Sequence, residues 1–209
     1  DESEDSEDVR RIASISNFND SGFSLPFSLS TKPTVDFRDE MFDLVHVHHP
    51  FLLGELGMQY ARQEGIPLVF TYHTQYENYT HYVPINEETA TKTIIAHATE
   101  FSNMCDLVIA PTLDIKKQLR ARGVESRIAV LPSGVKMDEF SNADAWKARE
   151  ALGISDDQTL LLYVGRLAHE KNMDFIFNAA LKVLEENKST VFAVAGHGAD
   201  EDALKQRAA

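Results

Sequence analysis

Cysteine is almost absent from this chain of 209 residues, which contains Cys105 and no other. One thiol forms no internal disulfide, so a disulfide-held fold is excluded and a reducing compartment is compatible. Long apolar runs are also missing, since none approaches the roughly 18 residues that a membrane span needs. No segment has the pattern of a signal peptide. From these absences we expect a cytoplasmic protein.

Basic residues are scarce relative to acidic ones, with 20 Lys and Arg against 33 Asp and Glu and a net charge of -13. Binding the phosphates of a nucleic acid requires a basic face, so the acidic surplus argues against nucleic acid as the partner. Six of the acidic residues crowd into residues 1–8. That segment has too much charge and too little apolar surface to pack, and we expect it to be disordered.

What the chain does contain is an alternation of two apolar patterns. Short runs of β-branched and other apolar residues predict strands, at residues 9–15, 44–47, 68–71, 107–110, 128–131, 160–164 and 191–195. Apolar residues at helical spacing predict helices, at residues 52–63, 88–101, 114–121 and 173–186. Strands that are apolar on both faces and alternate with helices favour an α/β fold with parallel sheets.

A change of composition divides the chain. The expected strand at residues 128–131 is followed by the turn sequence Pro132-Ser133-Gly134-Val135 and then by about 25 largely polar residues. A turn and a long polar passage are typical of a domain boundary. We therefore expect one domain at residues 9–134 and, at residues 135–209, a linker with the first part of a second domain.

The candidate chemistry follows the expected strands, because ligands of parallel α/β sheets bind beyond the carboxyl ends of the strands. Residues 165–172 lie between a buried strand and a helix. Gly165 lets the backbone come close to a ligand, while Arg166 and Lys171 supply positive charge beside the N–H groups of a helix start. This pattern favours an anionic ligand such as a diphosphate. The alternative is a structural turn with a solvated cluster of charges.

A second glycine turn, Gly196-His197-Gly198, follows the last expected strand. It fits a loop that approaches a phosphate, and it equally fits a tight turn with a helix cap. The third glycine of the dinucleotide fingerprint is missing, which disfavours a nicotinamide cofactor.

Histidines at two strand ends raise a metal hypothesis. His46 and His48 share one face of an expected strand, and His73 follows the next strand. A His-x-His pair at a strand end is found in metal-dependent hydrolases of barrel architecture, which also need His or Asp ligands at later strand ends. Prolines and a glycine stand at those later ends instead. We therefore expect no metal, and a histidine packed in the core is the simpler interpretation.

Aromatic residues crowd residues 72–82, where Tyr76 and Tyr79 are two of four tyrosines. Rings stack on apolar faces while their hydroxyl tips meet polar groups, so the segment suits a sugar or a lipid headgroup. A partly buried loop is the alternative. The basic helix at residues 114–121, extended by Arg122, either touches an anionic membrane surface or forms a solvated face.

Several of these segments together resemble one enzyme family. They are Phe42-Asp43-Leu44-Val45-His46-Val47-His48, Thr71-Tyr72-His73-Thr74, Ala110-Pro111-Thr112, Leu131-Pro132-Ser133-Gly134-Val135, and Gly165-Arg166-Leu167 with Glu170-Lys171-Asn172. In order and spacing they resemble the retaining glycosyltransferases of family 4, which have the GT-B fold, from about residue 9 onward. Residues 73–82 are most similar to the diacylglycerol glucosyltransferase branch.

The resemblance implies two Rossmann-like domains facing a cleft, the first holding mainly the acceptor and the second mainly a nucleotide sugar. It implies that Arg166 and Lys171 hold the donor diphosphate and that His73 lies by the reacting sugar. Further residues on the acceptor side would be His48, Tyr76 and Tyr79, and on the donor side Gly165, Gly196 and Gly198. No metal or other cofactor is expected.

The reaction that the resemblance implies is transfer of a hexosyl group, most simply glucosyl from UDP-glucose, to an acceptor hydroxyl with retention at the anomeric carbon. The acceptor would be a diacylglycerol lipid or a small molecule. A lipid acceptor would add peripheral contact with a membrane to the expected cytoplasmic location.

The sequence also departs from the family pattern. The first strand and the glycine-rich loop of the acceptor domain are missing, and so is the Glu pair that binds donor sugar and ribose. We therefore expect both domains to be incomplete and this chain by itself to be inactive. A noncatalytic nucleotide-binding or interaction domain is the competing interpretation, and a metal-dependent hydrolase using His46 and His48 is a further one.

Overall fold

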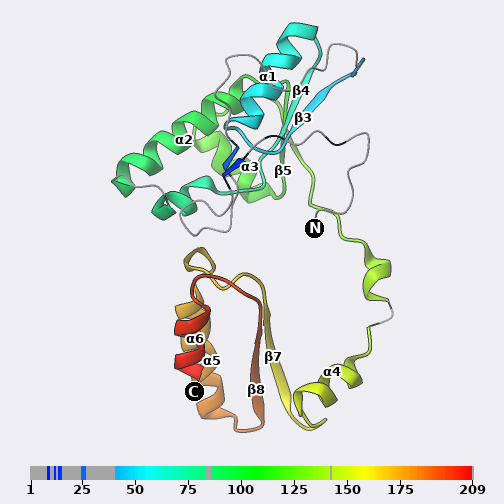
Figure 1. The fold of residues 1–209 in the computed structure, drawn as a ribbon, viewed down its shortest axis with the longest axis vertical. Helices are drawn as coiled ribbons and strands as arrows, with labels where there is room; N and C mark the ends of the chain where they lie inside the picture. Colours follow the sequence, from blue (N-terminus) through cyan, green and yellow to red (C-terminus); the bar gives the residue numbers. More distant parts are fainter. Residues whose placement is uncertain are drawn as a thin grey trace. The chain divides into compact units, whose positions relative to one another are not determined.

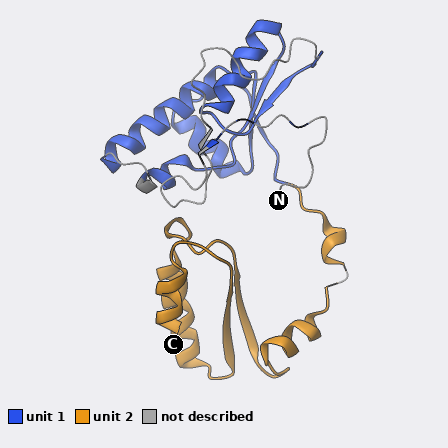
Figure 2. Cartoon of the chain, viewed as in Figure 1, with its two compact units in different colours: residues 1–133 blue, residues 134–209 orange. Residues whose placement is uncertain are grey.

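The computed structural model describes residues 9, 12, 14–15, 25–26, 41–82, 86–141 and 143–208, with the backbone alone at residues 15, 25–26 and 81–82. The chain divides into two compact units, Asp1–Ser133 and Gly134–Ala209 (Figure 2). Each unit is described by itself. The acidic segment 1–8, which we expect to be disordered, lies outside the described residues.

Unit 1 is built on a parallel sheet of four strands in the order β3-β4-β5-β6 (Figure 1). The strands are β3 (Val45–Val47), β4 (Leu68–Thr71), β5 (Leu107–Ala110) and β6 (Ile128–Val130). The helices between them are α1 (Leu53–Glu64), α2 (Glu87–Asn103) and α3 (Leu113–Ala121). Because every connection passes through a helix, neighbouring strands run parallel and their carboxyl ends lie at one edge of the sheet.

The core of unit 1 is formed by the buried residues of its strands and helices. Phe70 on β4 and Val108 on β5 face the core, and Phe101 of α2 packs against them. All three residues are 0% exposed. Helix ends are set by local chemistry: the side chain of Thr112 caps α3, and Gly65 closes α1 in the left-handed region at φ 67°.

The first strand differs from its prediction. The expected strand at residues 9–15 is described as strand only at β1 (Ser14–Ile15), which pairs antiparallel with β2 (Leu25–Pro26) in a separate small sheet. The connection between the two is shorter than the roughly dozen residues that a parallel crossover requires, so only antiparallel pairing is possible.

Unit 2 contains two parallel strands, β7 (Thr159–Val164) and β8 (Thr190–Ala195), in register from Thr159 opposite Thr190 to Val164 opposite Ala195. Helices α5 (Met173–Glu186) and α6 (Glu201–Ala208) both pack on one face of this pair, against Tyr163, Phe192 and Val194 (Figure 1). On the opposite face Leu162 is 57% exposed and Val164 is 71% exposed. Covering of both faces, which the apolar strands predict, is therefore not seen for β7 and β8 among the described residues.

The polar passage before β7 contains a helix that was not expected, α4 (Ala145–Leu152). The carboxylate of Asp144 accepts from the backbone N–H groups of Trp146 and Lys147, and Gly153 ends the helix in the left-handed region. These are the start and stop residues that a short helix needs. None of the helices in the described ranges has the length and apolar character that spanning a bilayer demands.

Candidate functional site

Three histidines lie in a row at the carboxyl edge of the unit 1 sheet. The His46 and His48 rings are 4.3 Å apart between centroids, and His48 and His73 are 5.5 Å apart. His46 Nε2 is also 2.7 Å from Thr71 Oγ1, which joins the end of β3 to the end of β4. All three rings are exposed. The structure therefore brings together the histidines that the sequence placed at two strand ends.

The pKa values of two of these histidines are lowered. Partial burial is the main cause at both, and the neighbouring His48 adds to it at His46 and at His73. Removing water and adding a second positive charge both disfavour an imidazolium, so the neutral ring prevails at neutral pH. A neutral imidazole both donates and accepts a hydrogen bond.

A metal site has no structural support in the part of the chain that the structure describes. Within those ranges no group of three or more His, Cys, Asp or Glu residues is arranged to hold a metal ion. The rings of His46, His48 and His73 instead lie next to one another in tilted arrangements, with interplanar angles of 38° and 37°. The metal-dependent hydrolase interpretation therefore lacks its ligand set there.

The loop after β4 continues into the 3-10 helix η2 (Tyr76–Tyr82). Tyr76 is only 6% exposed, with its ring edge-on to His49, Phe51 and Tyr72 and its hydroxyl donating to the carbonyl of His48 over 3.4 Å. In this conformation Tyr76 supports the His48 backbone from the core and presents little surface to a ligand. Tyr79 is half-buried and lies nearer to solvent.

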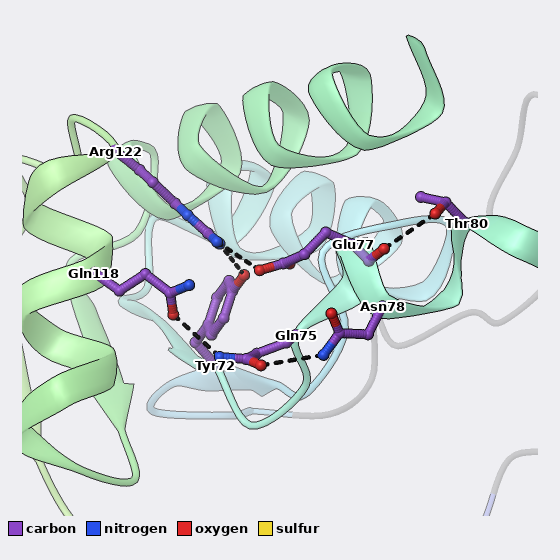
Figure 3. Close-up of polar contacts among 7 residues, drawn as sticks. All are labelled: Tyr72, Gln75, Glu77, Asn78, Thr80, Gln118 and Arg122. Atoms are coloured by element: carbon purple, nitrogen blue, oxygen red, sulfur yellow. Dashed lines mark hydrogen bonds and ion pairs between the residues drawn. The ribbon is translucent and has the colours of Figure 1, made fainter. Parts of the chain in front are cut away.

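A polar network fixes this loop against α3 (Figure 3). Arg122 Nη2 lies 2.5 Å from Glu77 Oε1, and Arg122 Nη1 donates to the Tyr72 hydroxyl over 3.1 Å. Burial, with Glu77 as the next cause, raises the pKa of Tyr72 to about 12, so its hydroxyl stays protonated. Both earlier interpretations of Arg122, a membrane contact and a solvated face, are wrong for this residue. No local sequence signal points to this pair, because Glu77 and Arg122 lie 45 residues apart.

Two further basic residues of α3 have local partners. Lys117 pairs with Asp114 at 3.2 Å, and Arg120 Nη1 donates to the carbonyl of Val124. The Lys117 side chain is 76% exposed, so a solvated face describes this residue.

The loop after β7 holds the two cations that the sequence singled out. Arg166 Nη2 forms an ion pair with Glu170 Oε1 at 2.7 Å, and the Glu170 side chain is only 3% exposed. The Tyr163 hydroxyl donates to the Arg166 carbonyl over 2.9 Å, which fixes the backbone of the turn. Lys171 is exposed at the end of the 3-10 turn η4 (His169–Lys171), directly before α5. The two cations thus differ, because one has a buried carboxylate partner and the other faces solvent.

The glycines of the second turn let two strand-end loops touch. A Cβ atom at Gly196 would lie 1.8 Å from the carbonyl oxygen of Gly165, and one at Gly198 would lie 2.1 Å from that of Leu167. The Leu167 N–H also donates to the His197 carbonyl over 2.9 Å. Only glycine fits at both positions, so Gly196 and Gly198 have a packing role at this end of β7 and β8.

Parallel α/β units with polar loops at their strand ends form a class of proteins that bind small ligands at those loops. Within that class the chain belongs to glycosyltransferase family 4. Residues 1–139 match the family described as Glycosyltransferase Family 4, and residues 144–209 match Glycosyl transferases group 1. The resemblance found in the sequence motifs is confirmed.

Relatives and solved structures agree with this assignment. The chain is 28% identical to the alpha-monoglucosyldiacylglycerol synthase of Acholeplasma laidlawii over 177 residues, covering 80% of this chain and 44% of that protein. It is 32% identical to the synthase of the same name from Streptococcus pneumoniae over 176 residues, covering 82% and 40%. These names bear out the predicted diacylglycerol glucosyltransferase branch. The chain spans less than half the length of both relatives.

The fold likeness extends to a crystal structure of Anabaena Alr3699/HepE in complex with UDP-glucose. The TM-score is 0.62 at 18% sequence identity, over 79% of this chain and 43% of that one. The predicted α/β fold of the GT-B type, with parallel sheets, is confirmed by this likeness and by the observed strand pairing.

Proposed function

We propose that the protein to which this chain belongs transfers a hexosyl group, glucosyl in the first instance, from UDP-glucose to the hydroxyl of a diacylglycerol. The observation that carries the proposal is the likeness to two glucosyldiacylglycerol synthases across about 80% of the chain. The parallel α/β units and the cationic strand-end loop of unit 2 are compatible with such a donor. A lipid acceptor adds peripheral contact with a membrane from the cytoplasmic side.

In unit 2, Arg166 and Lys171 are proposed to hold the donor diphosphate. Negative charge grows on the diphosphate as the glycosidic bond breaks, and cations aimed there stabilise the transition state. The ion pair with Glu170 is compatible with this role, because a guanidinium has five N–H donors in a planar fork and Glu170 fixes its orientation. Gly165, Gly196 and Gly198 would keep the backbone low enough for the phosphates to approach.

In unit 1, His73 is proposed to lie beside the reacting sugar, and His48 and Tyr79 to contact the acceptor. The lowered pKa of His73 keeps its ring neutral, so it can donate a hydrogen bond to a sugar or acceptor hydroxyl without adding charge. Tyr76 would act from beneath, through the His48 backbone. The reaction is proposed to proceed with retention and without a metal, since Arg166 and Lys171 supply the positive charge.

The test is turnover of UDP-glucose by the intact protein, with dioleoylglycerol in mixed micelles as acceptor and glycerol as its soluble analogue. Arg166→Ala and Lys171→Ala should each lower kcat about a hundredfold or more, as loss of one oxyanion contact does elsewhere. Lys182→Ala, a charge change on the exposed side of α5, serves as the control and should leave kcat within twofold.

Three outcomes would contradict parts of the proposal. Unchanged kcat in both variants would remove the diphosphate role from Arg166 and Lys171. Loss of turnover in EDTA, restored by a divalent cation, would contradict the metal-free reaction. Binding of UDP by the intact protein without transfer to either acceptor would favour the noncatalytic interpretation.

A further inference from the structure

One ion pair ties the loop after β4 to the end of α3, across 45 residues of sequence. Arg122, the residue that ends α3, directs both Nη atoms at this loop: Nη2 to Glu77 Oε1 at 2.5 Å and Nη1 to the Tyr72 hydroxyl at 3.1 Å (Figure 3). Tyr72 is 2% exposed. The guanidinium therefore contacts the loop at its start and at its middle.

The ion pair of Arg122 and Glu77 is more buried than an ordinary surface ion pair. The side chains of Arg122 and Glu77 are 17% and 13% exposed, whereas Lys117 and Asp114 on the same helix are 76% and 90% exposed. Glu77 Oε2 is buried and makes no hydrogen bond. Burying two charges costs desolvation that their attraction only partly returns, so such a pair contributes little net stability and more to selecting one geometry.

A second anchor reinforces the first one turn away on α3. Gln118 Oε1 accepts from Gln75 Nε2 over 3.2 Å, and Gln75 Oε1 in turn accepts from Asn78 Nδ2 over 3.1 Å. Residues four apart on a helix lie on one face, so Gln118 and Arg122 hold the loop from neighbouring positions. They contact Gln75 and Glu77, and between these two residues the ring of Tyr76 enters the core.

The segment that Gln118 and Arg122 hold carries two of the side chains proposed above to meet the substrates, His73 and Tyr79. His73 precedes Gln75 by two positions, and Tyr79 follows Glu77 by two. Both are more exposed than the tyrosines that anchor the loop from below. The polar anchors thus hold the backbone while leaving these two side chains toward solvent.

We propose that Arg122 and Glu77, with Gln118 and Gln75, are positioning residues for acceptor recognition. They fix the loop so that His73 and Tyr79 meet the acceptor in one arrangement. This inference rests on the proposed function and adds to it a set of residues, two of them on α3, that need not touch either substrate. The donor diphosphate is proposed to bind unit 2, so loss of these anchors in unit 1 should raise the acceptor KM and leave the donor KM largely unchanged. The value of kcat should fall as well, because His73 is proposed to lie beside the reacting sugar.

The experiment separates the two substrates by steady-state kinetics on the intact protein. Glu77→Gln keeps the shape of the side chain, and Arg122→Gln shortens it; each removes one charge. Each variant should raise the acceptor KM at least tenfold while the UDP-glucose KM stays within twofold. The double variant should be no worse than the poorer single variant, since the two residues act as one unit. Lys117→Gln is the matched control, because it removes a charge from the same helix at an exposed pair.

Gln118→Met is the milder second variant and keeps the inference open to test if the charge variants do not fold. It should raise the acceptor KM by a smaller factor, with the melting temperature close to that of the wild type. The acceptor probe is dioleoylglycerol in mixed micelles, or glycerol if the wild type turns over only that analogue.

Two results would overturn the inference while leaving the proposed function intact. One is an active wild type whose folded variants show an unchanged acceptor KM. The other is an equal rise in the KM for donor and acceptor, which a general loss of structure would produce. A wild type that transfers glucose to neither probe contradicts the proposed function, and the inference fails with it.

Discussion

At the scale of single residues, Cys105 shows what burial does to a reactive group. The thiol lies 6% exposed in the core of unit 1, where it donates to the carbonyl of Phe101. Burial, with the nearby Asp106 as a second cause, raises its pKa to about 12. A thiol with such a pKa is almost entirely protonated at pH 8, and the thiolate is the nucleophile.

Cys105 should therefore resist thiol reagents in the folded chain. At pH 8 we expect the reaction with Ellman's reagent to be slower than that of a free cysteine by at least a hundredfold. In guanidinium chloride it should reach the rate of the free amino acid. Rapid labelling of the folded chain at one thiol per molecule would show that Cys105 is not buried as described.

At the scale of elements, the start of α1 depends on one glycine. A Cβ atom on Gly54 would lie 1.8 Å from the carbonyl oxygen of His49 and 3.2 Å from the Phe101 ring. The nearer contact is with backbone, so a side chain here must push α1 away from the loop that carries His48 and His49. Overpacking of this kind typically costs about 1–3 kcal/mol.

Gly54→Ala should lower the free energy of unfolding of unit 1 by about 1–3 kcal/mol, measured by urea denaturation with a probe of unit 1. Gly134→Ala is the control, because no atom lies within 4 Å of its added Cβ. A Gly54→Ala variant as stable as the control would contradict the close approach of α1 to the His49 carbonyl.

The elements also show how far sequence reasoning reaches. Helix α5 and strands β4 and β5 were predicted at their observed bounds, because strong periodicity and clear breakers mark them. Helix α4 was missed, since it is only 8 residues long and its signals were single cap residues. Local sequence pattern therefore predicts the elements with strong periodicity and misses short ones such as α4.

The residues of the candidate site were also predicted only in part. His48, His73, Arg166 and Lys171 could be named because strand ends are where ligands bind in parallel sheets. The partner of Arg122 could not, since Glu77 lies 45 residues away and only the folded sheet brings them together. The buried position of Tyr76 was equally hidden, because a tyrosine in an aromatic loop reads the same whether its ring points inward or outward.

At the scale of the whole molecule, the histidines of unit 1 make stability depend on pH. The pKa values of His46, His49 and His73 are all lowered, mainly by burial, below the ordinary value of 6.5. Below that value these histidines bind protons more readily in the unfolded chain than in the folded chain, so acid favours unfolding. This contribution to stability is present above the ordinary value of 6.5 and is lost as the pH falls from 6.5 through the lower pKa values of the folded chain.

Unit 1 should accordingly lose stability between pH 7.5 and pH 5.5. The net charge of -13 works in the opposite direction, because acid relieves repulsion among carboxylates. The informative quantity is therefore the difference between variants: His46→Gln should flatten the fall in melting temperature, and Gln63→Asn, an exposed change that alters no titratable group, should not. Equal pH dependence in both variants would show that the histidine cluster does not cause it.

The sheet of unit 2 has a further consequence for the surface that this chain presents. The face that carries Leu162 and Val164 exposes two apolar residues on a strand. Contiguous exposed apolar side chains mark surfaces that associate with another apolar surface. This face of β7 is therefore the side of unit 2 that an apolar partner or a further layer of structure would cover most readily.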